Sequence, residues 1–153
     1  MIPELDDNVL PEGIHVCTID EVAAMFGRFW VTDRRIMLTA KLRRFVEEAR
    51  KSGFVQAIII DGSYVTGKKG PSDIDVIVGL RPDTDLSVSG GLFAIQLTNR
   101  RVLRRDYGVD VRSVPDRSDK FNELVEYYTH IRPDDPEQAS GKSRKGLLRI
   151  ELC

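Results

Sequence analysis

Two aspartates separated by one residue, Asp73 and Asp75, stand at the start of a segment rich in isoleucine and valine. If this segment is a β-strand, both carboxylates project from the same face while Ile74 and Val76 face a core. Two like charges at this distance repel one another unless a counter-charge is bound. A divalent cation supplies that charge, because Mg²⁺ prefers carboxylate oxygens completed by water and phosphate oxygens. The pair is therefore a candidate site for Mg²⁺ or Mn²⁺, and taken alone it also has the pattern of plain surface alternation on a strand.

A Gly-Ser pair, Gly62 and Ser63, follows another hydrophobic segment, residues 55–60. A turn at the end of a buried strand offers backbone N–H groups and a hydroxyl to phosphate oxygens. A metal beside a phosphate site is the minimum equipment for phosphoryl or nucleotidyl transfer. Lys68 and Lys69 follow in the same loop. Lys69 is assigned to the phosphate site, where its charge would screen a triphosphate, and a flexible, solvated lysine is the alternative.

The segment Ile60–Val78 resembles the signature of the DNA polymerase β-like nucleotidyltransferase superfamily, which is a hydrophobic strand, Gly-Ser, about ten residues and then Asp-x-Asp. Nine residues separate Ser63 from Asp73. The family generally adds a third carboxylate from a later strand, and Asp110, which has a valine on each side, fits that description. The resemblance covers residues 41–114, and the chain is similar in size to the minimal nucleotidyltransferases that pair with helical ribonuclease toxins.

This resemblance implies a metal-dependent enzyme that moves a nucleoside monophosphate from an NTP to an acceptor and releases pyrophosphate. Asp73, Asp75 and Asp110 would be its catalytic residues and would bind the cofactor, Mg²⁺ or Mn²⁺. Gly62 and Ser63 would hold the β- and γ-phosphates of the nucleotide, of which ATP is one candidate. The acceptor is a protein, a tRNA or a small molecule, and a partner protein from a toxin–antitoxin or defence pair is also implied.

Other interpretations of the same residues remain open. The chain could be a catalytically inactive nucleotidyltransferase-fold binding module, antitoxin-like or regulatory, and the discriminating feature is whether Asp110 joins the other two carboxylates. A sugar transferase also uses Asp-x-Asp, but it does not need the upstream Gly-Ser. The stretch from Gly62 to Lys68 matches most of a P-loop. Against a P-loop, Lys69 replaces the magnesium-binding Ser or Thr, and Gly70-Pro71 would break the helix that must follow.

The remaining patterns predict one α+β domain over residues 1–153, with a small mixed β-sheet flanked by helices in a nucleotidyltransferase fold. A capping box begins at Thr18, and glycines follow two of the predicted helices. We expect residues 1–17 to be extended and 132–145 to be a loop. The predicted helices are 19–26, 33–53, 92–104 and 119–130, and the predicted strands are 55–60, 73–80 and 109–114, with a possible edge strand at 147–152.

Composition excludes several classes of protein. The 23 basic and 24 acidic residues nearly cancel, so a nucleic acid or a membrane surface would need a local patch. Cys17 and Cys153 have no CxxC spacing, which argues against a zinc knuckle or a disulfide framework. The N-terminal sequence lacks the pattern of a signal peptide, and no apolar run could span a bilayer, so we expect a cytoplasmic protein with no membrane partner. A basic tail is interpreted as a solubility feature, with contact to nucleic acid or to a partner as the alternative, and comprises Lys142, Arg144, Lys145 and Arg149.

Overall fold

The computed structural model describes residues 1–28, 32–88, 90–131 and 142–152, which form an α+β domain, as the sequence predicts. Its strands make one mixed sheet in the order β1-β5-β2-β3-β4. The β3–β4 and β1–β5 pairs are parallel, and the β2–β3 and β2–β5 pairs are antiparallel. The strands are β1 (Ile14–Cys17), β2 (Val55–Asp61), β3 (Ile74–Leu80), β4 (Val109–Pro115) and β5 (Leu147–Glu151). The helices are α1 (Ile19–Phe26), α2 (Arg34–Ser52), the short 3₁₀ helix η1 (Ser63–Val65), α3 (Gly91–Leu97), α4 (Arg100–Tyr107) and α5 (Asp119–Thr129).

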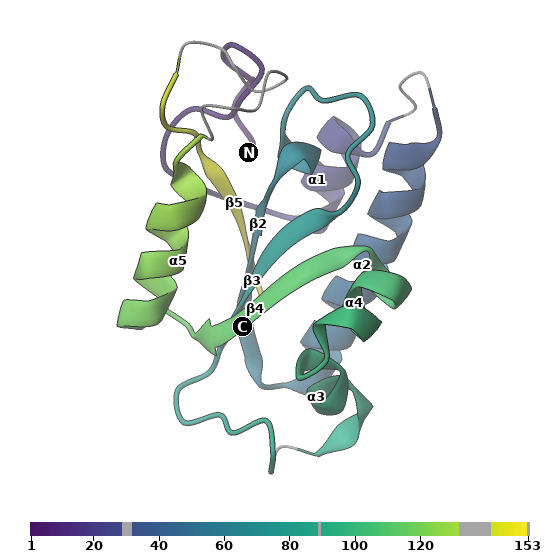
Figure 1. Ribbon diagram of the computed structural model, residues 1–153, viewed down its shortest axis with the longest axis vertical. Helices are drawn as coiled ribbons and strands as arrows, with labels where there is room; N and C mark the ends of the chain where they lie inside the picture. The colour runs from purple at the N-terminus through teal and green to yellow at the C-terminus, as the bar shows by residue number, and fades with distance from the viewer. Residues whose placement is uncertain (29–31, 89, 132–141, 153) are drawn as a thin grey trace.

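Helices cover both faces of the sheet (Figure 1). On one face, α1 to α4 enclose the larger core, in which Ile58 and Ile60 of β2 pack with Phe45 of α2. On the other face, α5 packs Phe121 against Ile59 and its strand neighbours. Because both faces of β2 are buried, its residues form a nearly continuous apolar run rather than an alternating one. No described helix has the length and apolar character needed to cross a membrane.

The predicted helix ends are largely confirmed. The Thr18 hydroxyl accepts a hydrogen bond from the backbone N–H of Glu21 and so caps α1. Ser118 caps α5 in the same way. Helix α2 ends at Gly53, which has a φ of 77°, a left-handed conformation that glycine adopts without a steric penalty. Asp33 precedes α2 as expected, although its side chain makes no capping hydrogen bond.

The structure corrects the single helix predicted over 92–104. The chain instead forms α3 and α4, separated at Thr98 and Asn99. The Asn99 side chain accepts a hydrogen bond from the N–H of Val102, so it begins a new helix. Asparagine competes for backbone hydrogen bonds in this way, and it therefore favours a cap over a helix interior.

The position of the last strand is also corrected. We expected an edge strand at 147–152, but β5 lies inside the sheet between β1 and β2. The edge position is taken by β1, which lies in the segment expected to be only extended. Leu147, Leu148 and Ile150 are all buried, on alternating sides of an interior strand.

The solubility interpretation of the basic tail is wrong, because two of its residues are buried. Arg149 forms a buried ion pair with Asp116 at 2.7 Å, and Lys145 is 5% exposed. Arg144 pairs with carboxylates on two other segments, and Lys142 pairs with Asp6. A lone charge costs free energy when it leaves water, so buried cations of this kind need ionic partners. Most of the loop predicted over 132–145 lies outside the described residues.

A buried arginine fixes the β2–β3 loop. The Arg35 guanidinium donates hydrogen bonds to the carbonyl oxygens of Tyr64 at 2.6 Å and Thr66 at 2.8 Å, and to that of Lys68. It also reaches the Phe26 carbonyl at the end of α1, at 3.2 Å. These carbonyls would otherwise be buried without donors, so one side chain holds the loop, α1 and α2 together.

Replacing Arg35 with methionine should therefore lower the free energy of unfolding by about 3 kcal/mol, since several buried carbonyls lose a charged donor. Arg35→Lys should recover only part of this, because an ammonium lacks the planar fork of donors. The control is Arg34→Met, whose guanidinium donates to Pro71 and Ser72 from an exposed position and should contribute under about 1 kcal/mol. Urea unfolding measures all three, and equal losses for Arg35→Met and Arg34→Met would contradict the anchoring role.

Candidate functional site

Strand register places three carboxylates in one row across the sheet. Asp75 of β3 is the direct partner of Asp61 on β2 and of Asp110 on β4. Residues that are direct partners on neighbouring strands project from the same face. We call Asp61, Asp75 and Asp110 the acid row. Asp73, one of the predicted metal ligands, lies just before β3 and two residues from Asp75, so the structure brings Asp73, Asp75 and Asp110 together.

The acid row lies on the face of the sheet that α5 covers. Ile59 and Ile77, each two residues from a member of the row, pack against Phe121 of α5. Burial varies along the row, since the Asp61 side chain is 4% exposed and the Asp110 side chain 17%. The carboxylates are therefore partly removed from water. Repulsion between like charges is stronger in this less polar surrounding than in water.

Asp61 is balanced by a buried lysine. The Lys145 ammonium lies 3.0 Å from a carboxylate oxygen of Asp61, and the Lys145 side chain is only 7% exposed. Lys145 lies just before β5, and its backbone N–H donates to the carbonyl of Thr129 at the end of α5. The last described strand thus brings a positive charge to one end of the acid row.

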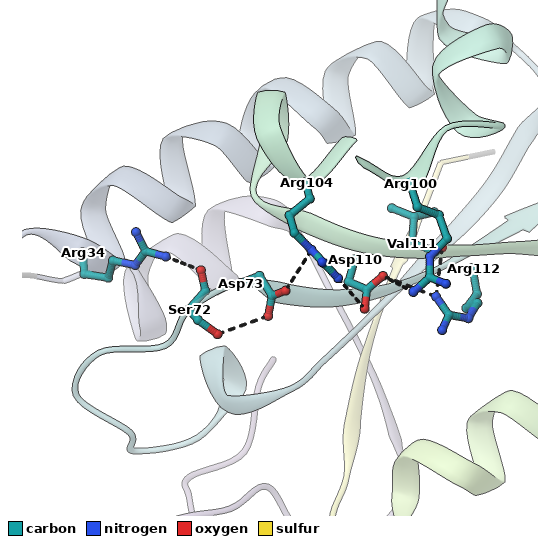
Figure 2. Close-up of polar contacts among 8 residues, drawn as sticks. All are labelled: Arg34, Ser72, Asp73, Arg100, Arg104, Asp110, Val111 and Arg112. Carbon is teal, nitrogen blue, oxygen red and sulfur yellow. Dashed lines mark hydrogen bonds and ion pairs between the residues drawn. The ribbon is translucent and has the colours of Figure 1, made fainter. Parts of the chain in front are cut away.

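Arginines balance the other end (Figure 2). Arg100 lies 2.7 Å from Asp110 and Arg112 lies 3.3 Å from it. The guanidinium of Arg104 contacts two carboxylates, that of Asp110 at 3.2 Å and that of Asp73 at 3.5 Å. Burial alone would raise the pKa of Asp110, but these contacts outweigh it and hold that pKa below its ordinary value.

Asp75 stands in the middle of the row without such a partner. Within the described part of the chain, no lysine or arginine nitrogen lies at ion-pair distance from its carboxylate. Burial raises the pKa of Asp75 to about 6, and the charges of Asp61, Asp73 and Asp110 contribute to the rise. Burial, and after it the charge of Asp75, raises the pKa of the Tyr128 hydroxyl on α5 to about 12.

Gly62 lies directly against Asp75. Its φ is 89°, and a Cβ at this position would come within 2.8 Å of an Asp75 carboxylate oxygen. A glycine is thus required both by the backbone conformation and by the close approach of the carboxylate. Ser63 follows at the start of η1, so the Gly-Ser pair adjoins the acid row, as expected.

The structure also shows the surroundings of Lys69 and the conformation of the segment that resembles a P-loop. Lys69 is exposed, and among the described residues none is its hydrogen-bond or ion-pair partner. After Gly62 the chain forms only η1, Ser63–Val65, before returning to β3. A P-loop needs a longer helix whose N-terminus holds the phosphate, so this geometry argues against that motif.

The acid row fits a hard divalent cation by the chemistry of its donors. All the donors are carboxylate oxygens, and the central one, on Asp75, carries a charge that no described cation pairs. Within the described ranges, no three His, Cys, Asp or Glu side chains are arranged to hold a metal ion. The guanidinium of Arg104 lies between Asp73 and Asp110, in the space that a cation shared by these two carboxylates would need.

Sequence reasoning missed several residues of this site. Asp61 could have been found by pairing the 55–60 strand with the 73–80 strand, because that register sets it opposite Asp75. The four-residue spacing of Arg100 and Arg104 places both on one face of a helix just before Asp110. Lys145 has no comparable signal, since its partner is distant in sequence and it stands among basic residues, Ser and Gly that have the pattern of a solvated loop.

The raised pKa of Asp75 predicts a pH-dependent stability. Because the folded-state pKa, about 6, exceeds the ordinary 3.8, the folded protein binds this proton more tightly than the unfolded chain. The free energy of unfolding should therefore rise as pH falls from about 7 to about 4, by roughly 2 kcal/mol and at most about 3 kcal/mol from this group. Asp75→Asn removes this contribution, so the variant should be more stable than the wild type at pH 7.5, less so at pH 5, and nearly equal in stability only below about pH 4, where the unfolded chain is also protonated.

Urea unfolding across this pH range, in the presence of a chelator, measures the difference between the two proteins. Other groups titrate in both proteins and cancel in the difference. A stability difference that does not change through pH 6 would contradict the placement of Asp75 as a buried, unpaired carboxylate beside other aspartates.

Comparison with known proteins assigns the chain to a family. No curated protein and no solved structure matches the chain. One family profile matches residues 3–151, which include every strand and helix described above. The chain therefore belongs to the family of unknown function DUF6932.

Proposed function

We propose that this protein is a small metal-dependent nucleotidyltransferase related to the DNA polymerase β-like superfamily. The observation that carries the proposal is the register of Asp61, Asp75 and Asp110, with Gly62 against the central carboxylate. The Asp-x-Asp pair, the upstream Gly-Ser and the later aspartate are thereby consistent with a single site. The donor chemistry of these residues, carboxylate oxygens beside a Gly-Ser turn, supports a site for a cation and a nucleotide triphosphate.

Each residue has a role in the proposed reaction. Asp73, Asp75 and Asp110 would hold Mg²⁺ or Mn²⁺, which when bound would draw negative charge from the phosphate to be attacked. Gly62 and Ser63 would hold the β- and γ-phosphates through backbone N–H groups and the serine hydroxyl.

The transfer forms one bond and breaks one. The acceptor oxygen bonds to the α-phosphorus, and the bond from that phosphorus to pyrophosphate breaks. Asp110 would contact the acceptor hydroxyl and help to remove its proton. The acceptor is a protein side chain, a tRNA end or a small molecule, and a partner protein from a toxin–antitoxin or defence pair is a candidate for the first of these.

One observation favours a second candidate, a catalytically inactive binding module with the same fold. Arg104 lies between Asp73 and Asp110, and Lys145 pairs with Asp61. Four cations, Arg100, Arg104, Arg112 and Lys145, thus pair with three of the four carboxylates, and only Asp75 has no such partner among the described residues. If these contacts persist in the presence of metal and nucleotide, the aspartates are structural and the protein acts by binding alone.

Substitution of the central carboxylate separates the two functions. The protein is incubated with each labelled NTP, Mg²⁺ or Mn²⁺, and a lysate of the source cell, and label transferred to any component is counted. Asp75→Asn should abolish the transfer, because it removes one ligand charge without changing the size of the side chain. Ser63→Ala should reduce it only about tenfold, since one hydroxyl contact is lost and the backbone N–H groups remain.

A matched control is Asp83→Asn, an exposed aspartate with a φ of 64°, which asparagine tolerates equally well. It should transfer label like the wild type. Wild-type transfer by a folded Asp75→Asn would disprove the metal assignment. No transfer by the wild type with any NTP would favour the binding module.

A further inference from the structure

Three arginines beside the acid row are more exposed than the carboxylates they contact. The side chains of Arg100 and Arg104 are 52% and 56% exposed, and that of Arg112 is 37% exposed. The carboxylates of Asp110 and Asp73 are 17% and 30% exposed. We call Arg100, Arg104 and Arg112 the arginine set. Its members come from α4 and β4, which meet at the end of the sheet where Asp110 lies (Figure 2).

These ion pairs are easily broken. A half-exposed pair contributes at most about 1 kcal/mol to stability, because water and salt screen the charges and the long side chain loses freedom. The three guanidiniums also exceed the two carboxylates that they contact, so they carry one surplus positive charge. The arginine set can therefore change partners at little cost to the fold.

Arg104 is the residue whose position conflicts with a cation. It contacts Asp73 and Asp110 at the same time, and a cation shared by these carboxylates would need the space between them. Once the carboxylates had another partner, all three guanidiniums would face the site without a counter-charge. Guanidinium groups pair strongly with phosphate oxygens, with two parallel hydrogen bonds when the geometry allows.

We propose that the arginine set exchanges the carboxylates for the triphosphate of the substrate when cation and nucleotide bind. This inference rests on the proposed nucleotidyltransferase function and adds residues that bind the polyphosphate. Without ligand, Arg104 and its neighbours neutralise Asp73 and Asp110. With both ligands, the carboxylates hold the cation and the arginines hold phosphate oxygens.

The exchange couples the two ligands. A cation alone must displace Arg104 and leave the arginine set unpaired, so it binds weakly. A triphosphate alone must compete with the carboxylates for the same guanidiniums. Together they satisfy both sets of charges, and by thermodynamic linkage each raises the affinity for the other by the same factor.

The test measures two affinities in the wild type and in Arg104→Met. The probes are Mn²⁺ alone, followed by electron paramagnetic resonance, and the complex of Mn²⁺ with inorganic tripolyphosphate, followed by calorimetry. Tripolyphosphate removes any dependence on the base. Arg104→Met should bind Mn²⁺ alone roughly fivefold more tightly, because no ion pair has to be broken. It should bind the complex about tenfold more weakly, because a phosphate contact is lost.

The matched control is Arg101→Met, on the same helix and exposed, which no described carboxylate contacts. It removes the same charge and should leave both affinities within about twofold of the wild type. Circular dichroism confirms that both variants are folded.

The outcomes distinguish the inference from the function on which it rests. Opposite shifts of the two affinities in Arg104→Met support the exchange. If the wild type binds both probes but Arg104→Met shifts them in the same direction, or shifts neither, the exchange is overturned and the proposed function stands. Equal binding of tripolyphosphate with and without Mn²⁺ also overturns it, because the arginines then form a simple anion site. If the wild type binds neither probe, both proposals fail.

Discussion

Strand pairing holds three aspartates side by side, and their carboxylates repel one another. The other charged residues of the site are arranged around this repulsion. The register of β2, β3 and β4 fixes Asp61, Asp75 and Asp110 in one row, and none of the three strands can slip by one residue without moving its apolar residues out of the core. The charges therefore cannot move apart. They are offset by cations brought from elsewhere, Lys145 at one end and the arginine set at the other. Among the described residues, only the central carboxylate, that of Asp75, has no cation partner. Its pKa is therefore raised by burial and by the neighbouring aspartates.

The approach of the β2–β3 loop to this row depends on a second interaction, between Arg35 and the loop carbonyls. The loop contains glycines and lysines and has little apolar surface of its own beyond Tyr64 and Val65. Arg35 and the hydrogen bond between Thr39 and Tyr64 fix it to α2. Helix α2 packs on the opposite face of the sheet from the acid row. The contacts that hold the loop, and with it Gly62, therefore lie on the face away from the carboxylates.

Local patterns predicted most of the fold, because caps and apolar periodicity act over a few residues. The ends of α1 and α2 and the existence of β2, β3 and β4 follow from such signals. What could not be predicted depends on partners distant in sequence. The interior place of β5 requires β1, and the burial of Lys145 and Arg149 requires Asp61 and Asp116. A run of basic residues near Pro, Ser and Gly has the same local appearance whether it is solvated or buried.

The candidate site shows the same division. The two-residue spacing of Asp73 and Asp75 predicts that their carboxylates share one face, and the spacing of Gly62 and Ser63 from them predicts that the Gly-Ser turn belongs to the same site. That Asp110 joins them depended on which strands are neighbours, and the structure places β4 beside β3. The contacts of Arg104 could not be inferred, because a guanidinium at the end of a flexible side chain has no periodicity that specifies its partner.

The interior position of β5 has a consequence for the order in which the protein is made. This strand leaves the ribosome after every other described strand, yet it joins β1, from the start of the chain, to β2 in the middle. Contacts between segments so far apart in sequence form slowly, since a long loop must close before they are made. A chain in which β2 and β3 had paired before β5 joined them would hold Asp61 beside Asp75 without Lys145, and the edges of β1 and β2 that β5 covers would stay open. Completion of the sheet and neutralisation of Asp61 by Lys145 are therefore a single step, which depends on the last described strand.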